Sequence, residues 1–263
     1  MKKAIMYLLL ALGITLVVMF IGGAVVGFVA GFIEGFRGEE VGADTSMSVM
    51  VYAASASVIL LCIVLNWVFL KFGFANYSLG RIPERSSVRL KVAAGVMLVM
   101  AGLAVLQCSM EDVFQVAEND ALVKEAYAWM RQHPIYSILI LCVAEATGNL
   151  VIYGAVLREI LEWKHRPVIV IPVFAIIIGL FSMVAGNSML VVSGVLVALV
   201  EACVYEYTRS IIPIIIGDVV FWIVTLCLVG IPAQTWWPFA AWLLATPGIP
   251  LVLKTMDPYK PID

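Results

Sequence analysis

Charged side chains are scarce in this chain. Its 263 residues include only 16 basic and 18 acidic ones, whereas 63% are hydrophobic. A soluble domain of this composition would leave too much apolar surface in water. The net charge of −2 also provides no basic field for nucleic acid. The composition therefore indicates an integral membrane protein and argues against a nucleic-acid partner.

Histidine and paired cysteines are scarce as well. The two histidines, His133 and His165, lie at the edges of apolar runs, which excludes a histidine-rich metal centre. No Ser-His-Asp, HExxH, GxGxxG or Walker pattern is present. The sequence thus predicts neither a metal nor a cofactor. Five cysteines lie in or beside apolar runs without paired spacing, and we interpret them as packing residues: Cys62, Cys108, Cys142, Cys203 and Cys227.

Eight long apolar runs are present, and about 20 apolar residues suffice to cross a bilayer as a helix. The first run is too long for a signal peptide and lacks a clear cleavage site, so we expect an uncleaved span. We predict an all-α fold, a polytopic transmembrane helical bundle forming a single membrane domain over residues 1–263. The expected spans lie near residues 4–33, 47–70, 90–108, 135–157, 168–186, 189–206, 211–230 and 237–254.

Basic residues are distributed unequally between the connecting segments. If the N-terminus lies inside, the inner segments hold 13 of the 16 basic residues. Positive charge favours the cytoplasmic side, so we predict a multi-pass membrane protein with both termini in the cytoplasm. The outer segment 109–134 has the apolar positions of an amphipathic helix, lying at the membrane interface or packed on the spans. Tryptophans typical of interfacial anchors stand at the ends of runs: Trp163, Trp236 and Trp237.

Several polar side chains lie inside the apolar runs, where an ionisable group costs at least ~2.5 kcal/mol. Glu145 and Asn149 are spaced i and i+4, which places them on one helix face. Asp218 follows Gly217, whose missing side chain permits close approach of another helix. Glu201 faces inward or lies near the inner interface. These groups either hold the bundle together by interhelical hydrogen bonds or form a polar site, and the sequence leaves both interpretations open.

Three stretches of the second half carry a family resemblance. Residues 193–213 combine a glycine-led span, a Tyr-x-x-Thr-x-Ser turn and a following proline. Residues 152–157 look like a Phe-Arg-Gly run, and residues 181–185 look like a Phe-x-x-x-His motif. Over roughly residues 135–230 the chain thus resembles the CPBP family of CAAX proteases and bacteriocin-processing intramembrane glutamic proteases. The resemblance implies that family's eight-span fold. Within the turn, Glu206 and Arg209 are spaced i and i+3 and can pair.

The residues that this family uses for catalysis are not preserved. The resemblance places its Glu-Glu pair on Gly148 and Asn149, and its Arg on Tyr153. General-base hydrolysis needs a carboxylate or an imidazole within hydrogen-bond reach of water. We therefore expect a catalytically degenerate member that lacks the family's peptidase activity. The two His positions and the Asn position fall, in that order, on Ala185, near Gly217 and on Phe221.

Three functions are compatible with this pattern. We favour a pseudoprotease-like protein that binds or scaffolds a membrane protein, a lipidated peptide or a lipid, as a subunit of a membrane complex. The second is a CPBP-type peptidase with a rearranged site, for which Glu145, Asn149 and Asp218 are the candidate catalytic residues. The third is an ion- or proton-coupled transport subunit that uses Glu145 and Asp218. The candidates for binding a ligand or partner are Glu145, Asn149, Tyr153, Glu201 and Asp218.

Overall fold

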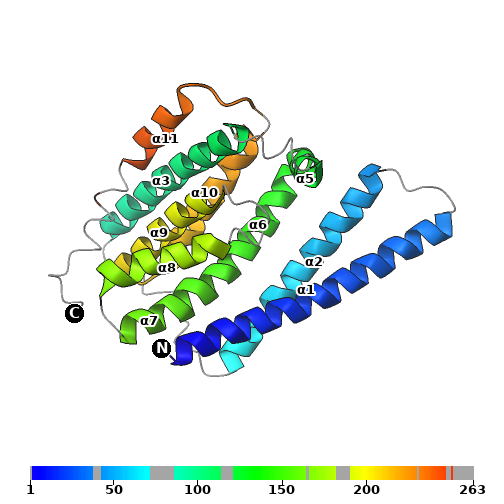
Figure 1. The fold of residues 1–263 in the computed structure, drawn as a ribbon, viewed down its shortest axis with the longest axis horizontal. Helices are drawn as coiled ribbons and strands as arrows, with labels where there is room; N and C mark the ends of the chain where they lie inside the picture. The colour runs from blue at the N-terminus through cyan, green and yellow to red at the C-terminus, as the bar shows by residue number, and fades with distance from the viewer. Residues whose placement is uncertain are drawn as a thin grey trace.

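A computed structural model describes residues 2–37, 43–71, 86–113, 121–163, 166–181, 190–229, 231–246 and 250. Within these ranges the regular structure is helical and contains no strand, which confirms the all-α fold class. Figure 1 shows elongated helices lying side by side. In chain order they are α1 (Lys2–Arg37), α2 (Ala43–Lys71), α3 (Ser86–Val113), α5 (Ala121–Gln132), α6 (Pro134–Asn149), η1 (Leu150–Leu157), α7 (Arg158–Trp163), α8 (Pro167–Phe181), α9 (Leu190–Thr208), α10 (Ile212–Leu228) and α11 (Trp237–Ala245).

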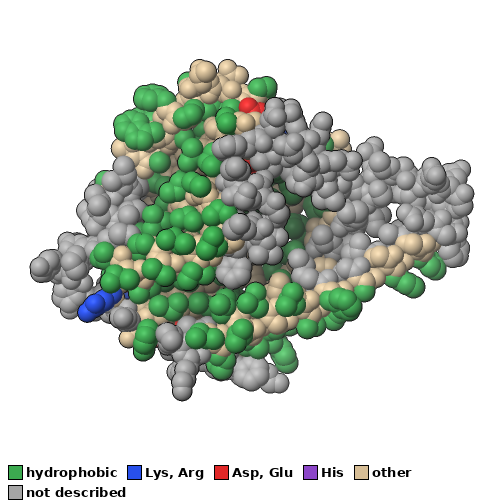
Figure 2. Space-filling model, in the orientation of Figure 1, with side chains coloured by type: hydrophobic (Ala, Val, Ile, Leu, Met, Phe, Trp, Pro, Cys, Tyr) green, Lys and Arg blue, Asp and Glu red, His purple; other side chains and the backbone are tan. Residues whose placement is uncertain are grey.

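Several of these helices have the length and composition of membrane spans. Hydrophobic side chains cover much of the described surface in Figure 2, as expected of a membrane protein. Three apolar helices are shorter: Ser55–Leu65, Pro167–Leu180 and Ile212–Leu228. Within the described ranges, four helices are long and apolar enough to cross a membrane: Ile5–Gly22, Val92–Val113, Pro134–Trp163 and Val191–Thr208. The total of eight crossings stays a prediction.

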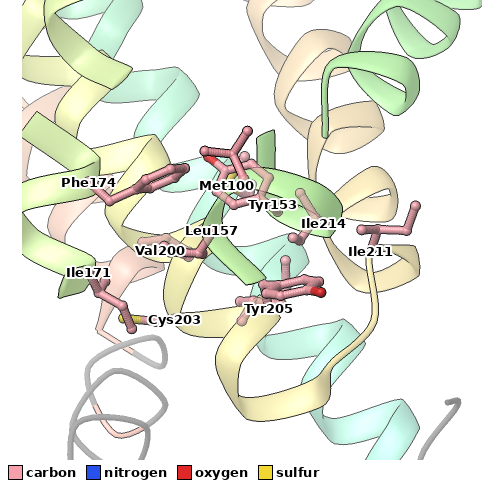
Figure 3. Close-up of a cluster of buried hydrophobic side chains, with 14 of the residues drawn as sticks. Met100, Tyr153, Leu157, Ile171, Phe174, Val200, Cys203, Tyr205, Ile211 and Ile214 are labelled. Atoms are coloured by element: carbon pink, nitrogen blue, oxygen red, sulfur yellow. The ribbon is translucent and has the colours of Figure 1, made fainter. Parts of the chain in front are cut away.

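The bundle has its core where α3, η1, α9 and α10 meet. Helix α10 packs along α3, α8 packs along α9, and α11 packs on α3. Helix α6 contacts both α10 and α2, and the α1–α2 hairpin reaches the rest of the bundle through α5, α6, η1 and α7. The apolar side chains of this core, drawn in part in Figure 3, include Met100, Leu157, Cys203, Tyr205 and Ile214.

Two glycines allow neighbouring helices to approach closely. A Cβ atom on Gly217 of α10 would lie 2.8 Å from a side-chain carbon of Val96 and 2.9 Å from one of Met100, both on α3. A Cβ atom on Gly179 of α8 would lie 2.7 Å from the backbone nitrogen of Val195 on α9. These distances are well below the ~3.5–4.0 Å of favourable carbon contacts. The prediction that Gly217 permits close helix approach is confirmed.

The span Pro134–Trp163 contains a π-helical segment, η1, between α6 and α7. The backbone N–H of Arg158 donates a hydrogen bond to the carbonyl of Tyr153, five residues earlier. π-Helical turns are rare in proteins, and those that occur often lie at functional sites. Here the segment starts directly after Asn149 and includes Tyr153, so it lies among the candidate site residues.

Two expectations, one about residues 109–134 and one about the tryptophans, have different outcomes. The helix expected within residues 109–134 is confirmed as α5, which packs on α2, α6 and α10. Trp163 and Trp236 are exposed, but Trp237 is buried with Val105 and Cys108 in a second, smaller core. The interpretation of Trp237 as an interfacial anchor is therefore wrong, because α11 turns this side chain onto α3.

Candidate functional site

Four of the candidate residues converge where the helix Pro134–Trp163 meets α9 and α10. The Asn149 Nδ2 atom donates a hydrogen bond to Asp218 Oδ2 at 2.5 Å. The Tyr153 hydroxyl donates one to Glu201 Oε2, also at 2.5 Å. The carboxyl groups of Glu201 and Asp218 lie within hydrogen-bond reach of each other. The four side chains thus form one continuous chain, Asn149–Asp218–Glu201–Tyr153, which we call the polar network.

The polar network is buried. The ring of Phe174 on α8 packs against that of Tyr153 with 5.8 Å between the ring centres, and other apolar side chains surround it in Figure 3. No ion pair within the described ranges involves Glu201 or Asp218. The two carboxyl groups therefore rely on hydrogen bonds, which are strong where the local dielectric is low. The exposed fractions are 1% for Tyr153, 3% for Asn149, 4% for Asp218 and 7% for Glu201.

Glu145 lies one helical turn before Asn149 and contacts the same neighbouring helix. Its Oε1 atom accepts a hydrogen bond from the indole nitrogen of Trp222 on α10 at 3.3 Å. Because Trp222 follows Asp218 by four residues, the pairs Glu145–Trp222 and Asn149–Asp218 form successive bridges between α6 and α10. The prediction that Glu145 and Asn149 share a helix face is confirmed. Glu145 is partly exposed and lies within electrostatic range of Asp218.

The corner between α9 and α10 places Glu201 opposite Asp218. Arg209, just after α9, has a positive φ of 51°, a conformation uncommon for residues other than glycine. It pairs with Glu206 at 2.9 Å, as the i and i+3 spacing predicted. The chain therefore turns within a few residues, and α10 begins at Ile212. Glu201 lies about two turns before this corner and Asp218 about two turns after it, so the two side chains face each other at the same level of α9 and α10.

The site contains one partner that sequence reasoning missed, and α1 carries a second missed feature. Trp222 gave no signal, because an aromatic residue in an apolar run is usually a core residue.

On α1, glycines recur at four-residue intervals, and a G-x-x-x-G pattern in an apolar helix is a signal for helix pairing. Cβ atoms built on Gly27 and Gly31 would have no atom within 4 Å. We call this series the glycine ladder: Gly23, Gly27, Gly31 and Gly35.

A further buried carboxyl group, Glu111, lies on α3 outside the polar network. It accepts hydrogen bonds from Gln107 at 2.9 Å and from the hydroxyl of Tyr127 on α5 at 3.2 Å. Burial raises the pKa of the Tyr127 hydroxyl, and the neighbouring Glu111 raises it further. The hydroxyl therefore stays protonated as a donor. This cluster attaches α5 to α3 and has the arrangement of a structural contact.

Metal ligands, the other positions of the family resemblance and known proteins were also compared with the site. Within the described part of the chain, no group of three or more His, Cys, Asp or Glu side chains could hold a metal ion. Phe221 is buried against Trp222, whereas Ala185 lies outside the described residues. Comparison with known proteins gives no match: no family model, no curated protein and no solved structure matches this chain.

Proposed function

We propose that this chain is an eight-span, CPBP-like membrane protein without peptidase activity, which binds another membrane protein as a subunit of a membrane complex. The proposed setting is a bacterial inner membrane with both termini in the cytoplasm. A lipid or a lipidated peptide is the other class of partner for such a scaffold. The observation that carries the proposal is the glycine ladder of α1, where Gly27 and Gly31 face open space.

The glycine ladder has the features of a surface for a partner helix. On the other side of α1, Gly22 packs closely on Ser57 of α2. Phe28 and Phe32 are 73% and 58% exposed, and their rings stack with 6.2 Å between centres. Small residues spaced by four let two helix backbones approach, and van der Waals packing then favours association in lipid. A second transmembrane helix would therefore fit against the glycines, beside the two phenylalanines.

The polar network supports the absence of peptidase activity. A general base must reach the water that it activates, but Asp218 and Glu201 are only 4% and 7% exposed. Their oxygens accept hydrogen bonds from Asn149 and Tyr153, which occupy positions that carry catalytic residues in the family. These bonds join three helices. The network therefore favours a role in holding the bundle together over the rearranged peptidase.

The test is to purify the tagged protein from its native membrane in mild detergent and to quantify co-eluting membrane proteins by mass spectrometry. We expect a stoichiometric partner with the wild type and its loss with Gly27→Leu and Gly31→Leu, because leucine fills the space between the helices. Gly13→Leu is the matched control, since Gly13 also lies on α1 with no atom near its Cβ position but stands outside the ladder. A partner retained by both ladder variants would refute the proposal.

A second candidate is the ion- or proton-coupled transport subunit. It is favoured by the electrostatic proximity of Glu145 to Asp218, and by the partial exposure of Glu145. Its test is ion flux into vesicles that contain the purified complex. Glu145→Gln should abolish a coupled flux, whereas Glu162→Gln, at an exposed carboxyl paired with Arg158, should not. Equal fluxes in both variants would discard this function.

A further inference from the structure

The polar network contains a contact that two ionised carboxyl groups cannot make. Asn149 and Tyr153 each supply a donor, one to Asp218 and one to Glu201. An ionised carboxylate only accepts hydrogen bonds. The contact between the carboxyl groups of Glu201 and Asp218 therefore has no donor unless one of the two is protonated.

The charges around this pair lead to the same conclusion. The titratable groups that face it are Cys142 and Glu145 on α6 and Tyr153 on η1, and none of them supplies positive charge. No Lys or Arg within the described ranges forms an ion pair with Glu201 or Asp218. Two carboxylates this close repel each other strongly in an apolar site, because like charges disfavour joint ionisation. One proton removes the repulsion and supplies the missing donor.

We propose that Glu201 and Asp218 form a proton-binding site, which holds one proton shared between the two carboxyl groups at neutral pH. Asn149 and Tyr153 each donate to one oxygen of the pair, and the proton lies between the two carboxyl groups, where α9 faces α10. Its release would leave two facing anions and would weaken the contact between these helices. The inference depends on the polar network alone and is independent of the glycine ladder.

Infrared spectroscopy of the detergent-solubilised protein tests this site. The wild type should show, at neutral pH, a carbonyl-stretch band of a protonated carboxylic acid that shifts to lower frequency in D2O. Glu201→Gln and Asp218→Asn should each remove the same band, because either amide supplies the donor that the proton supplied. Glu145→Gln and the exposed-site control Glu162→Gln should leave that band in place.

The outcomes separate a shared proton from its alternatives. Two independent acids would leave part of the band in each single variant. A cation between two carboxylates would give no band that Glu201→Gln or Asp218→Asn removes, and the stability of the protein would depend on sodium. Either result would overturn the proposal. If the amide variants do not fold, titration of the wild type decides the question. The band must then disappear in a one-proton transition as the pH is raised, at the same pH with and without sodium.

Discussion

Removing the side-chain amide of Asn149 should destabilise the folded protein by about 1–2 kcal/mol. In Asn149→Ala, Asp218 loses its donor at 2.5 Å in a site where it is only 4% exposed. An unsatisfied buried polar group costs ~1–3 kcal/mol in soluble proteins. Interhelical hydrogen bonds in membrane proteins average ~0.6 and reach ~1.7 kcal/mol. Because Asp218 carries a carboxyl group and water cannot replace the donor, we expect a loss of stability near the upper end of the values for membrane proteins.

The cysteines of the chain provide the assay. Cys62, Cys108 and Cys203 are buried, so a thiol-reactive dye should label them only when the helices separate on heating in detergent. The more accessible Cys142 and Cys227 give the baseline before unfolding. For a chain of this size, 1 kcal/mol corresponds to roughly 2–4 °C. Asn149→Ala should therefore lower the midpoint temperature by several degrees.

A double-mutant cycle shows whether the loss comes from the hydrogen bond. Asn149→Ala should cost less in an Asp218→Ala background, because the acceptor is already absent. We expect a coupling free energy of at least ~0.5 kcal/mol, the lower end for residues in contact. If the two losses simply add, Asn149 stabilises the protein through something other than Asp218, and the reasoning from the polar network fails.

Two further predictions use the same thermal assay. Gly179→Ala should lower the free energy of unfolding by about 1–3 kcal/mol, because its Cβ atom would collide with the Val195 backbone. The control Gly95→Ala has no atom near the new Cβ and should be neutral or stabilising by up to ~1 kcal/mol. Equal midpoint temperatures for the two variants would contradict the close packing of α8 on α9. Tyr127→Phe should cost about 1 kcal/mol by removing the donor to Glu111. Because the pKa of Tyr127 is raised above the ~10 of an ordinary tyrosine, ultraviolet titration to that pH should give the same phenolate absorbance in the wild type and in Tyr127→Phe; a smaller absorbance in the variant would refute this contact.

The positions of the helices and some of the site residues could be predicted from the sequence. Long apolar runs can bury their backbone polar groups in lipid only as helices, so runs expected near 135, 189 and 211 begin as helices at Pro134, Leu190 and Ile212. Glu145 and Asp218 were recognisable because an ionisable group stands out in an apolar run.

The partners of these residues could not be predicted. Trp222 looks like a packing residue in the sequence, and Tyr153 was a candidate only through the family resemblance. The hydrogen bonds of both depend on which helices lie opposite. The bond between Tyr153 and Glu201 also requires η1, which has no local sequence signature, whereas the turn at Arg209 was expected from residues 205–210. Glu145 and Asn149 bond to α10 and not to each other, because Trp222 and Asp218 present partners at the same four-residue spacing.

The polar network distributes its carboxyl groups differently from the CPBP pattern that we propose for this chain. The proposed resemblance would align a carboxyl pair with positions 148 and 149, whereas the carboxyl groups of the network stand on α9 and α10 and position 149 supplies a donor. A glutamate at position 149 would face Asp218, which already lies within hydrogen-bond reach of Glu201. Within the described ranges no cation pairs with Glu201 or Asp218. A third carboxyl group would therefore add electrostatic repulsion and would not act as a general base. A glutamate at position 149 is therefore incompatible with this network, and Asn149→Glu should weaken the contact between α6 and α10.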